Sequence, residues 1–228
     1  MPDYVFPPAP VPAIPVRGSA ALFPVRRIYC IGRNYAAHTV EMGGDPDREA
    51  PFFFQKNPDA ADASGEFPWP EPSLEVHHEI ELAVALGAGG RDIPLAEAMA
   101  CVWGYGVALD MTCRDLQAEA KAQGRPWEVA KAAERSAPIS ALIPAAEVAH
   151  PDRGAITLRV NGALRQEGDL GQMIWKTPEI IAVLSRHFLL APGDLILTGT
   201  PSGVGPVTRG DLLEGSVAGI GGLRVQVI

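Results

Sequence analysis

Glycine and proline interrupt this chain at short intervals, and this feature constrains the fold more than any other. The 228 residues include 24 glycines and 22 prolines, about a fifth of the chain, whereas these two residues make up about 12% of an average protein. Both residues interrupt helices, so the pattern argues against a helical bundle and favours strands and turns with a few helices. Because 47% of the residues are hydrophobic, the chain can bury one core without disulfides or a structural metal.

The spacing of apolar residues predicts mainly strands. Residues 77–86 alternate between large apolar side chains and smaller or acidic ones, which is the period of a strand. Asn161-Gly162 predicts the turn of a hairpin over 155–166. Strands do not alternate regularly with helices, which disfavours a doubly wound sheet or a TIM barrel. Further strands are expected at 27–32, 51–56, 105–112, 195–200 and 216–228, and helices at 95–102, 114–123 and 179–188.

Charge and targeting signals exclude several classes of function. The formal net charge is −8 and no basic run occurs, so we expect no binding to nucleic acid. The N-terminal residues lack the basic and apolar regions of a signal peptide, and the longest apolar stretch, 99–109, is too short to cross a membrane. The three cysteines form no Cys-x-x-Cys pair, which indicates a reducing cytoplasm. Walker A, Gly-x-Ser-x-Gly and His-Glu-x-x-His motifs are absent.

The first residues form a proline-rich segment. Six prolines fall within residues 2–15. Such a segment tends to adopt polyproline II and cannot join a central sheet. We expect an arm that packs along the surface or against a partner, and a loose tail is the alternative.

Glu79 and Glu81 are the first candidates for chemistry. On a strand they share a face, and two neighbouring carboxylates repel each other unless a cation lies between them. Oxygen ligands suit Mg²⁺ or Mn²⁺, and Asp110, at the end of the apolar strand 105–109, is a possible third ligand. The alternatives are an exposed strand face for the two glutamates and an ordinary Arg–Asp pair at a helix cap for Asp110.

Other polar residues supply candidate substrate contacts. Arg114 and Gln117 fall on one face of the expected helix and would place a guanidinium near the substrate. Lys131 follows an apolar-flanked stretch and would stabilise a developing enolate or oxyanion, with a solvated lysine as the alternative. The glycine cluster 199–205 either lines a site or forms a tight turn.

A histidine and a carboxylate suggest a general base. His38 and Glu41 are three residues apart, so they share a face if this stretch is helical. A carboxylate that orients a histidine makes a base near neutral pH, and a surface pair is the alternative. His77 and His78 leave zinc conceivable, although neither a thiolate nor a spaced histidine pair accompanies them.

Together these motifs resemble the fumarylacetoacetate hydrolase family. They occur in the family's order and the resemblance covers about residues 23–228, which leaves residues 1–22 as a proline-rich N-terminal arm before one catalytic domain. The matching motifs are Gly32-Arg33-Asn34-Tyr35, His38-x-x-Glu41, Glu79-Ile80-Glu81-Leu82, Asp110-x-x-x-Arg114-Asp115-x-Gln117, Lys131 and 197–205.

The resemblance implies a fold and a set of roles. The fold would be mixed α/β and β-rich, a roll with flanking helices, and the protein would form a homodimer. Glu79, Glu81 and Asp110 would hold Mg²⁺ or Mn²⁺, and His38 with Glu41 would activate water. The keto-acid end of the substrate would contact Arg114, Gln117, Lys131 and Thr200.

The start of the chain and residues 168–181 look like those of bacterial fumarylpyruvate hydrolases of gentisate breakdown. The implied reaction is hydrolysis of the C–C bond of a 3-acylpyruvate, fumarylpyruvate to fumarate and pyruvate. The alternatives are an acylpyruvase, oxaloacetate decarboxylase or dienoate isomerase of the same family, or a noncatalytic carboxylate-binding protein. One departure concerns residues 132–135, where the family usually has an aromatic residue and an aspartate and this chain has Ala-Ala-Glu-Arg.

Overall fold

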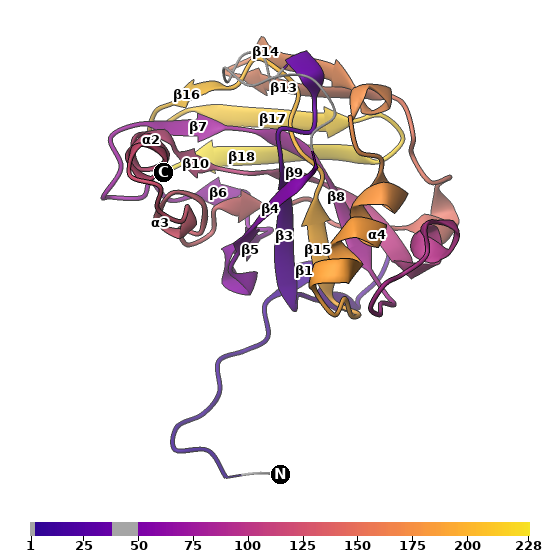
Figure 1. The fold of residues 1–228 in the computed structure, drawn as a ribbon. Helices are drawn as coiled ribbons and strands as arrows, with labels where there is room; N and C mark the ends of the chain where they lie inside the picture. The colour runs from indigo at the N-terminus through magenta and orange to yellow at the C-terminus, as the bar shows by residue number, and fades with distance from the viewer. Residues whose placement is uncertain (1–2, 38–49) are drawn as a thin grey trace.

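Two large sheets form the body of the protein (Figure 1). The computed structural model describes residues 3–37 and 50–228. The six-stranded sheet has the order β12-β9-β8-β15-β3-β4, and the five-stranded sheet has the order β14-β13-β17-β18-β6. Smaller sheets join β10, β7 and β16, β1 with β2, and β11 with β5. The mixed, strand-rich fold predicted from the motifs is therefore confirmed, and the sheets formed by the described residues do not close into a barrel.

The strands and helices have the following bounds. The six-stranded sheet comprises β12 (Ile143–Pro144), β9 (Val102–Leu109), β8 (Ile80–Leu86), β15 (Asp194–Leu197), β3 (Arg27–Gly32) and β4 (Phe52–Lys56). The five-stranded sheet comprises β14 (Ala163–Asp169), β13 (Ala155–Val160), β17 (Leu212–Val217), β18 (Gly221–Val227) and β6 (Glu66–Phe67). The short strands are β1 (Ala13–Pro15), β2 (Leu22–Pro24), β5 (Ala61–Asp62), β7 (Val76–His78), β10 (Thr112–Cys113), β11 (Ala137–Pro138) and β16 (Gly205–Val207). The α-helices that lie wholly within the described residues are α2 (Arg114–Ala122), α3 (Glu128–Lys131) and α4 (Thr177–His187), and 3₁₀ turns cover Pro58–Ala60, Leu95–Cys101, Ala145–Glu147 and Leu170–Gln172.

Strand β8 is buried along its whole length because both faces of its sheet are covered. Leu82 and Val84 belong to the main core, with residues of the five-stranded sheet and α4. Ala83 and Ala85 face a second cluster that includes Ile14. The alternation seen in the sequence thus separates two buried faces of different side-chain size.

The structure corrects the expectation of one continuous strand over 77–86. The chain leaves the three-stranded sheet at His78 and enters the six-stranded sheet at Ile80, so Glu79 lies between β7 and β8. The expected helix at 95–102 is a 3₁₀ helix. The hairpin turn at Asn161-Gly162 is confirmed, with φ values of 52° and 80°.

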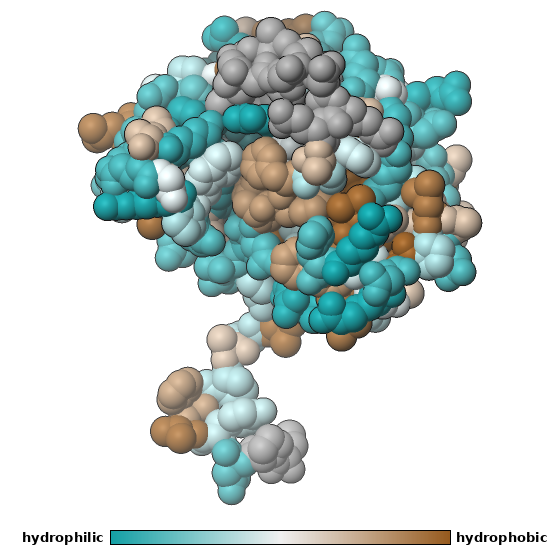
Figure 2. Space-filling model, in the orientation of Figure 1, coloured by the Kyte–Doolittle hydropathy of each residue, from teal (hydrophilic) through white to brown (hydrophobic). Residues whose placement is uncertain are grey.

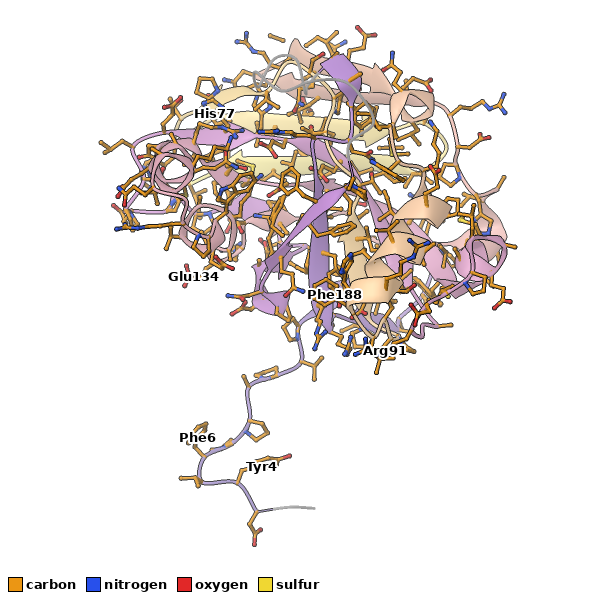
Figure 3. All side chains as sticks on the ribbon, viewed as in Figure 1. Tyr4, Phe6, His77, Arg91, Glu134 and Phe188 are labelled. Carbon is orange, nitrogen blue, oxygen red and sulfur yellow. The ribbon has the colours of Figure 1, made fainter. Side chains whose placement is uncertain are left out.

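The N-terminal arm extends away from the body (Figure 1). Its inner end is anchored, because β1 pairs with β2 and the Ile14 side chain is fully buried. Its outer part carries exposed apolar side chains, with Tyr4 64%, Val5 100% and Phe6 76% exposed (Figures 2 and 3). Within the described residues, no helix is long and apolar enough to cross a bilayer.

Candidate active site

Strand register brings the three candidate carboxylates together. In the antiparallel β8–β9 pair, Ile80 lies opposite Leu109, and the Asp110 N–H donates to the Glu79 carbonyl at 2.8 Å. Asp110 therefore lies across from Glu79 although 30 residues separate them in sequence. Donor oxygens of Glu79, Glu81 and Asp110 all lie within 4.8 Å of one another.

All three carboxylates are buried, with at most 5% of each residue exposed. The alternative of an exposed strand face for Glu79 and Glu81 is therefore wrong. Burial raises the pKa of Glu81 well above its usual range, and the charges of Asp110 and Glu79 raise it further. A buried cluster of this charge requires a cation.

The carboxylate cluster fits a hard divalent metal. Its members offer only oxygen atoms, which Mg²⁺ and Mn²⁺ prefer. Asp110 Oδ1 is buried and accepts no well-directed hydrogen bond, although the Lys56 ammonium lies 2.9 Å away. The site predicted from sequence is thus able to hold Mg²⁺ or Mn²⁺.

Lys131 ends α3 and points into this cluster. Its Nζ donates to Glu79 Oε2 at 2.7 Å and to Asp110 Oδ2 at 2.8 Å. Burial opposes its charge, but the two carboxylates more than offset this effect and raise the pKa of Lys131. The alternative of a solvated lysine is wrong, because only 3% of the residue is exposed.

Helix α2 contributes Arg114 and Gln117 from one face, as their spacing predicted. Arg114 Nη2 donates to Glu79 Oε1 at 2.5 Å, and Arg114 Nη1 donates to Gln117 Oε1 at 2.5 Å. Arg114 therefore pairs with Glu79, so the alternative of an ordinary Arg–Asp cap for Asp110 is wrong. These contacts orient the guanidinium beside the carboxylates.

A glycine loop after β15 completes the site. Gly199 has a φ of 93°, and a Cβ there would lie 2.6 Å from the Asn34 Cβ, so only glycine fits. Its N–H donates to Glu81 Oε2 at 2.6 Å. The next residue, Thr200, accepts a hydrogen bond at Oγ1 from Gln166 Nε2 at 2.8 Å. Of the two sequence interpretations of this glycine cluster, lining a site is the one that the structure supports.

Asn34, within the Gly-Arg-Asn-Tyr motif, links this motif to the glycine loop through hydrogen bonds. Its Nδ2 donates to the Thr198 carbonyl at 2.7 Å and to the Trp175 carbonyl at 2.9 Å, and its Oδ1 accepts from Trp175 N at 2.7 Å. The side chain thus ties the end of β3 to the glycine loop and to the segment before α4.

One hollow is lined by the candidates that lie within the described residues. His38 and Glu41 lie outside the described residues, so their roles stay predictions. The histidines 77 and 78 do not join the carboxylate cluster but contact its neighbours. His77 Nδ1 accepts from Arg114 Nε at 3.3 Å, and its Nε2 lies 2.8 Å from Glu75. His78 Nδ1 lies 2.9 Å from Gln166. The residues that line the hollow include Glu79, Glu81, Asp110, Arg114, Gln117, Lys131 and Thr200.

Two buried residues beside the site were not predicted from the sequence. Lys56 contacts Asp110, and Gln166 holds Thr200. The signal for Lys56 was a charged residue at the end of an apolar strand. Gln166 gave no local signal, because a polar residue in a hairpin strand is ordinarily solvated.

Comparison with known proteins identifies relatives over most of the chain. A family model described as "Fumarylacetoacetate (FAA) hydrolase C-terminal" matches residues 27–228. The chain is 43% identical over 201 residues to the mitochondrial oxaloacetate tautomerase FAHD1 of Arabidopsis thaliana, covering 88% of this chain and 90% of the relative. It is 42% identical over 198 residues to the oxaloacetate tautomerase YcgM of Escherichia coli, covering 86% and 90%.

A solved structure matches almost the entire chain. The fumarylpyruvate hydrolase from Pseudomonas aeruginosa, crystallised in complex with Mn²⁺ and pyruvate, has a TM-score of 0.97 and 50% sequence identity. The match covers 99% of both chains, so it extends into the N-terminal arm that the family model leaves out.

Proposed function

The chain belongs to the fumarylacetoacetate hydrolase family, and we propose that it is a metal-dependent hydrolase that cleaves the C–C bond of a 3-acylpyruvate, with fumarylpyruvate as substrate. The main support for this proposal is that three buried carboxylates line the same hollow as Arg114 and Lys131. The near-full-length similarity to a fumarylpyruvate hydrolase supports the choice of substrate.

The proposed metal ligands are Glu79, Glu81 and Asp110. A divalent ion bound there would polarise the keto and enol oxygens of the substrate. The chain's own residues would supply the remaining contacts.

Binding of the keto-acid end falls to α2 and the glycine loop. The Arg114 guanidinium would bind the substrate carboxylate, and the Gln117 amide lies beside it. Because Thr200 Oγ1 already accepts a hydrogen bond from Gln166, its own proton is available to donate to a substrate oxygen. Gln166 therefore sets the direction of that hydroxyl.

The reaction needs a base and a stabilised leaving group. In the proposal, His38 takes a proton from water with Glu41 behind it, and the resulting hydroxide adds to the distal acyl carbonyl. The C–C bond then breaks, its electron pair leaves as the enolate of pyruvate, and that carbon takes up the proton held by His38, while the released fumaric acid loses its proton to solvent. The Lys131 ammonium would stabilise the enolate oxygen as charge develops.

A second candidate is tautomerisation of oxaloacetate, the activity named for the curated relatives. It requires loss of the proton from the enol oxygen and addition of a proton at the adjacent enol carbon, with no attacking water. The same carboxylate cluster and Arg114 would serve this reaction.

One experiment separates the two candidates. The purified chain is incubated with fumarylpyruvate and Mn²⁺, and loss of the enol absorbance is followed together with formation of fumarate and pyruvate. Lys131→Met and His38→Ala should lose turnover, a chelator should abolish it, and Lys176→Met serves as the matched lysine control. If fumarylpyruvate persists while the enol of oxaloacetate is converted rapidly, the hydrolase proposal is wrong and the tautomerase stands.

The assembly and domain division from the sequence are further proposals. We propose a homodimer and an arm of residues 1–22 that precedes the catalytic domain 23–228. Sedimentation of the full chain and of a chain that starts at residue 23 tests both. A monomeric full chain would contradict the first, and failure of the shortened chain to fold would contradict the second.

A further inference from the structure

Helix α2 carries a third polar residue toward the hollow. Lys121 follows Arg114 by seven residues and Gln117 by four, so all three lie on one helix face. All three also line the same hollow. The proposed mechanism uses Arg114 and Gln117 and leaves Lys121 without a role.

The Trp127 ring contacts Lys121, an exposed residue that lines this hollow. Its Nζ lies 5.1 Å from the centroid of the Trp127 ring, a distance typical of a cation–π contact. The Trp127 ring meets the Phe52 ring edge-on, with centroids 5.4 Å apart. The Arg33 guanidinium lies 5.9 Å from the centroid of that second ring. Two cations therefore rest on two adjoining rings that line the site.

The charges around Lys121 favour an anion. Burial lowers its pKa, and repulsion from Arg114 and Arg33 lowers it further. Among residues 3–37 and 50–228, Lys121 forms no ion pair. The acidic groups lie deeper, where Glu79 is paired with Arg114 and Lys131.

We propose that Lys121, with Arg33 beside it, is a subsite for a second carboxylate, at the end of the substrate opposite the pyruvate unit. This inference rests on the proposed function, because the inner residues are there assigned to the keto-acid end. The preferred substrates are then dicarboxylic 3-acylpyruvates. An acyl group with a neutral end leaves the ammonium unpaired and gains nothing from it.

The test compares two substrates that differ at the distal end. Fumarylpyruvate carries a second carboxylate, whereas acetylpyruvate ends in a methyl group. Lys121→Met keeps the apolar stem and removes the charge. We expect kcat/KM for fumarylpyruvate to fall about tenfold, mainly through KM, and kcat/KM for acetylpyruvate to change less than about twofold.

Two further variants separate the charge from the packing. Lys121→Arg should retain most of the preference for fumarylpyruvate. Arg125→Met removes an exposed cation just beyond α2 and outside the hollow, so it should leave both substrates unaffected. Equal losses for both substrates in Lys121→Met, or no loss for either, would overturn the proposal.

A binding measurement keeps the subsite distinguishable from the reaction. Fumarate and crotonate differ in the same way, a carboxylate against a methyl group, and their affinities for the Mn²⁺-loaded protein are measured by calorimetry. Fumarate should bind more tightly than crotonate, and Lys121→Met should remove the difference. If the parent protein does not hydrolyse fumarylpyruvate but binds fumarate selectively through Lys121, the hydrolase proposal is wrong and the subsite is supported. If it hydrolyses fumarylpyruvate but binds fumarate no more tightly than Lys121→Met does, the subsite is wrong and the hydrolase proposal is supported.

Discussion

Replacing Lys56 with methionine tests whether a buried charge network holds the site together. Neither the Lys56 side chain nor that of Asp110 is exposed, and their charged atoms lie 2.9 Å apart. The Lys56 ammonium also donates to the Met111 carbonyl at 3.1 Å, to Ser136 Oγ at 3.0 Å and to the Lys131 carbonyl. It thereby joins β4 to Asp110 and to the end of α3.

The loss of folding stability in Lys56→Met is set by the buried polar groups that lose contact with the ammonium. Methionine nearly preserves the side-chain volume, so the cavity contribution is small. Asp110 keeps the contact with Lys131 but loses its second cation. Three buried acceptors each lose the hydrogen bond from Lys56, and of these the Lys131 carbonyl keeps one from Ser136 Oγ. Breaking a buried pair by removing one partner costs about 3–5 kcal/mol. A domain's entire stability is about 5–15 kcal/mol, so this is a large share.

Urea unfolding of the metal-free protein, followed by circular dichroism, measures this loss. The midpoint temperature should fall as well, by about 6–20 °C for a chain of this size. Lys176→Met is the matched control, because the Lys176 Nζ bonds only the Gly171 carbonyl among the described residues, in an exposed position, and should cost about 1 kcal/mol at most. A loss below about 1 kcal/mol for Lys56→Met would refute the reasoning, since it would mean that Asp110 does not depend on this ammonium.

Three further predictions concern metal binding, pH and the arm. Mn²⁺ at about 100 times its Kd should stabilise the fold by about 2.7 kcal/mol and raise Tm by about 5–10 °C; Glu81→Gln should abolish this shift in a thermal melt, and an equal shift in the variant would exclude Glu81 as a ligand. Burial pushes the pKa of Asp115 up, but hydrogen bonds from Ser73 Oγ and the N–H groups of Leu74 and Leu116 lower it overall. Its ionised form therefore stabilises the fold above the unfolded pKa of about 3.9, and this contribution disappears as pH falls through the lower folded pKa. Asp115→Asn should be less stable than the parent at pH 7 and equal to it near pH 2, and a pH-independent difference in urea midpoints would contradict this. Deleting residues 1–10 should leave Tm unchanged, whereas deleting residues 1–16 removes the buried Ile14 and Val16 and should cost at least about 2 kcal/mol; equal melts for both deletions would show that β1 contributes nothing.

Local patterns in the sequence were enough to predict most strands and one side of the site. The expected strand 27–32 matches β3 residue for residue, and the turn at Asn161-Gly162 follows from the positive φ that both positions adopt. Glu79 and Glu81 could be named together because residues two apart share a strand face. These features depend only on neighbours in the chain.

Burial on both faces of a sheet could not be predicted locally. The same Glu-x-Glu spacing suits an exposed strand face, and only the layers above and below β8 exclude water from Glu81. The interruption of the strand at Glu79 likewise arises because the chain passes from one sheet to another. The alternation of apolar residues over 77–86 continues through this point and does not indicate it.

The sequence by itself determined the strand-rich class, the candidate carboxylates and the family. Only the tertiary structure decided which charged side chains lie in contact. The β8–β9 register places Asp110 beside Glu79, and α3 places the Lys131 ammonium within hydrogen-bond distance of both. The contacts of Lys56 and Lys121 with the site were likewise evident only from the tertiary structure. The physical reason is that propensity and periodicity act over a few residues, whereas the electrostatic environment of a buried group is set by side chains far away in sequence.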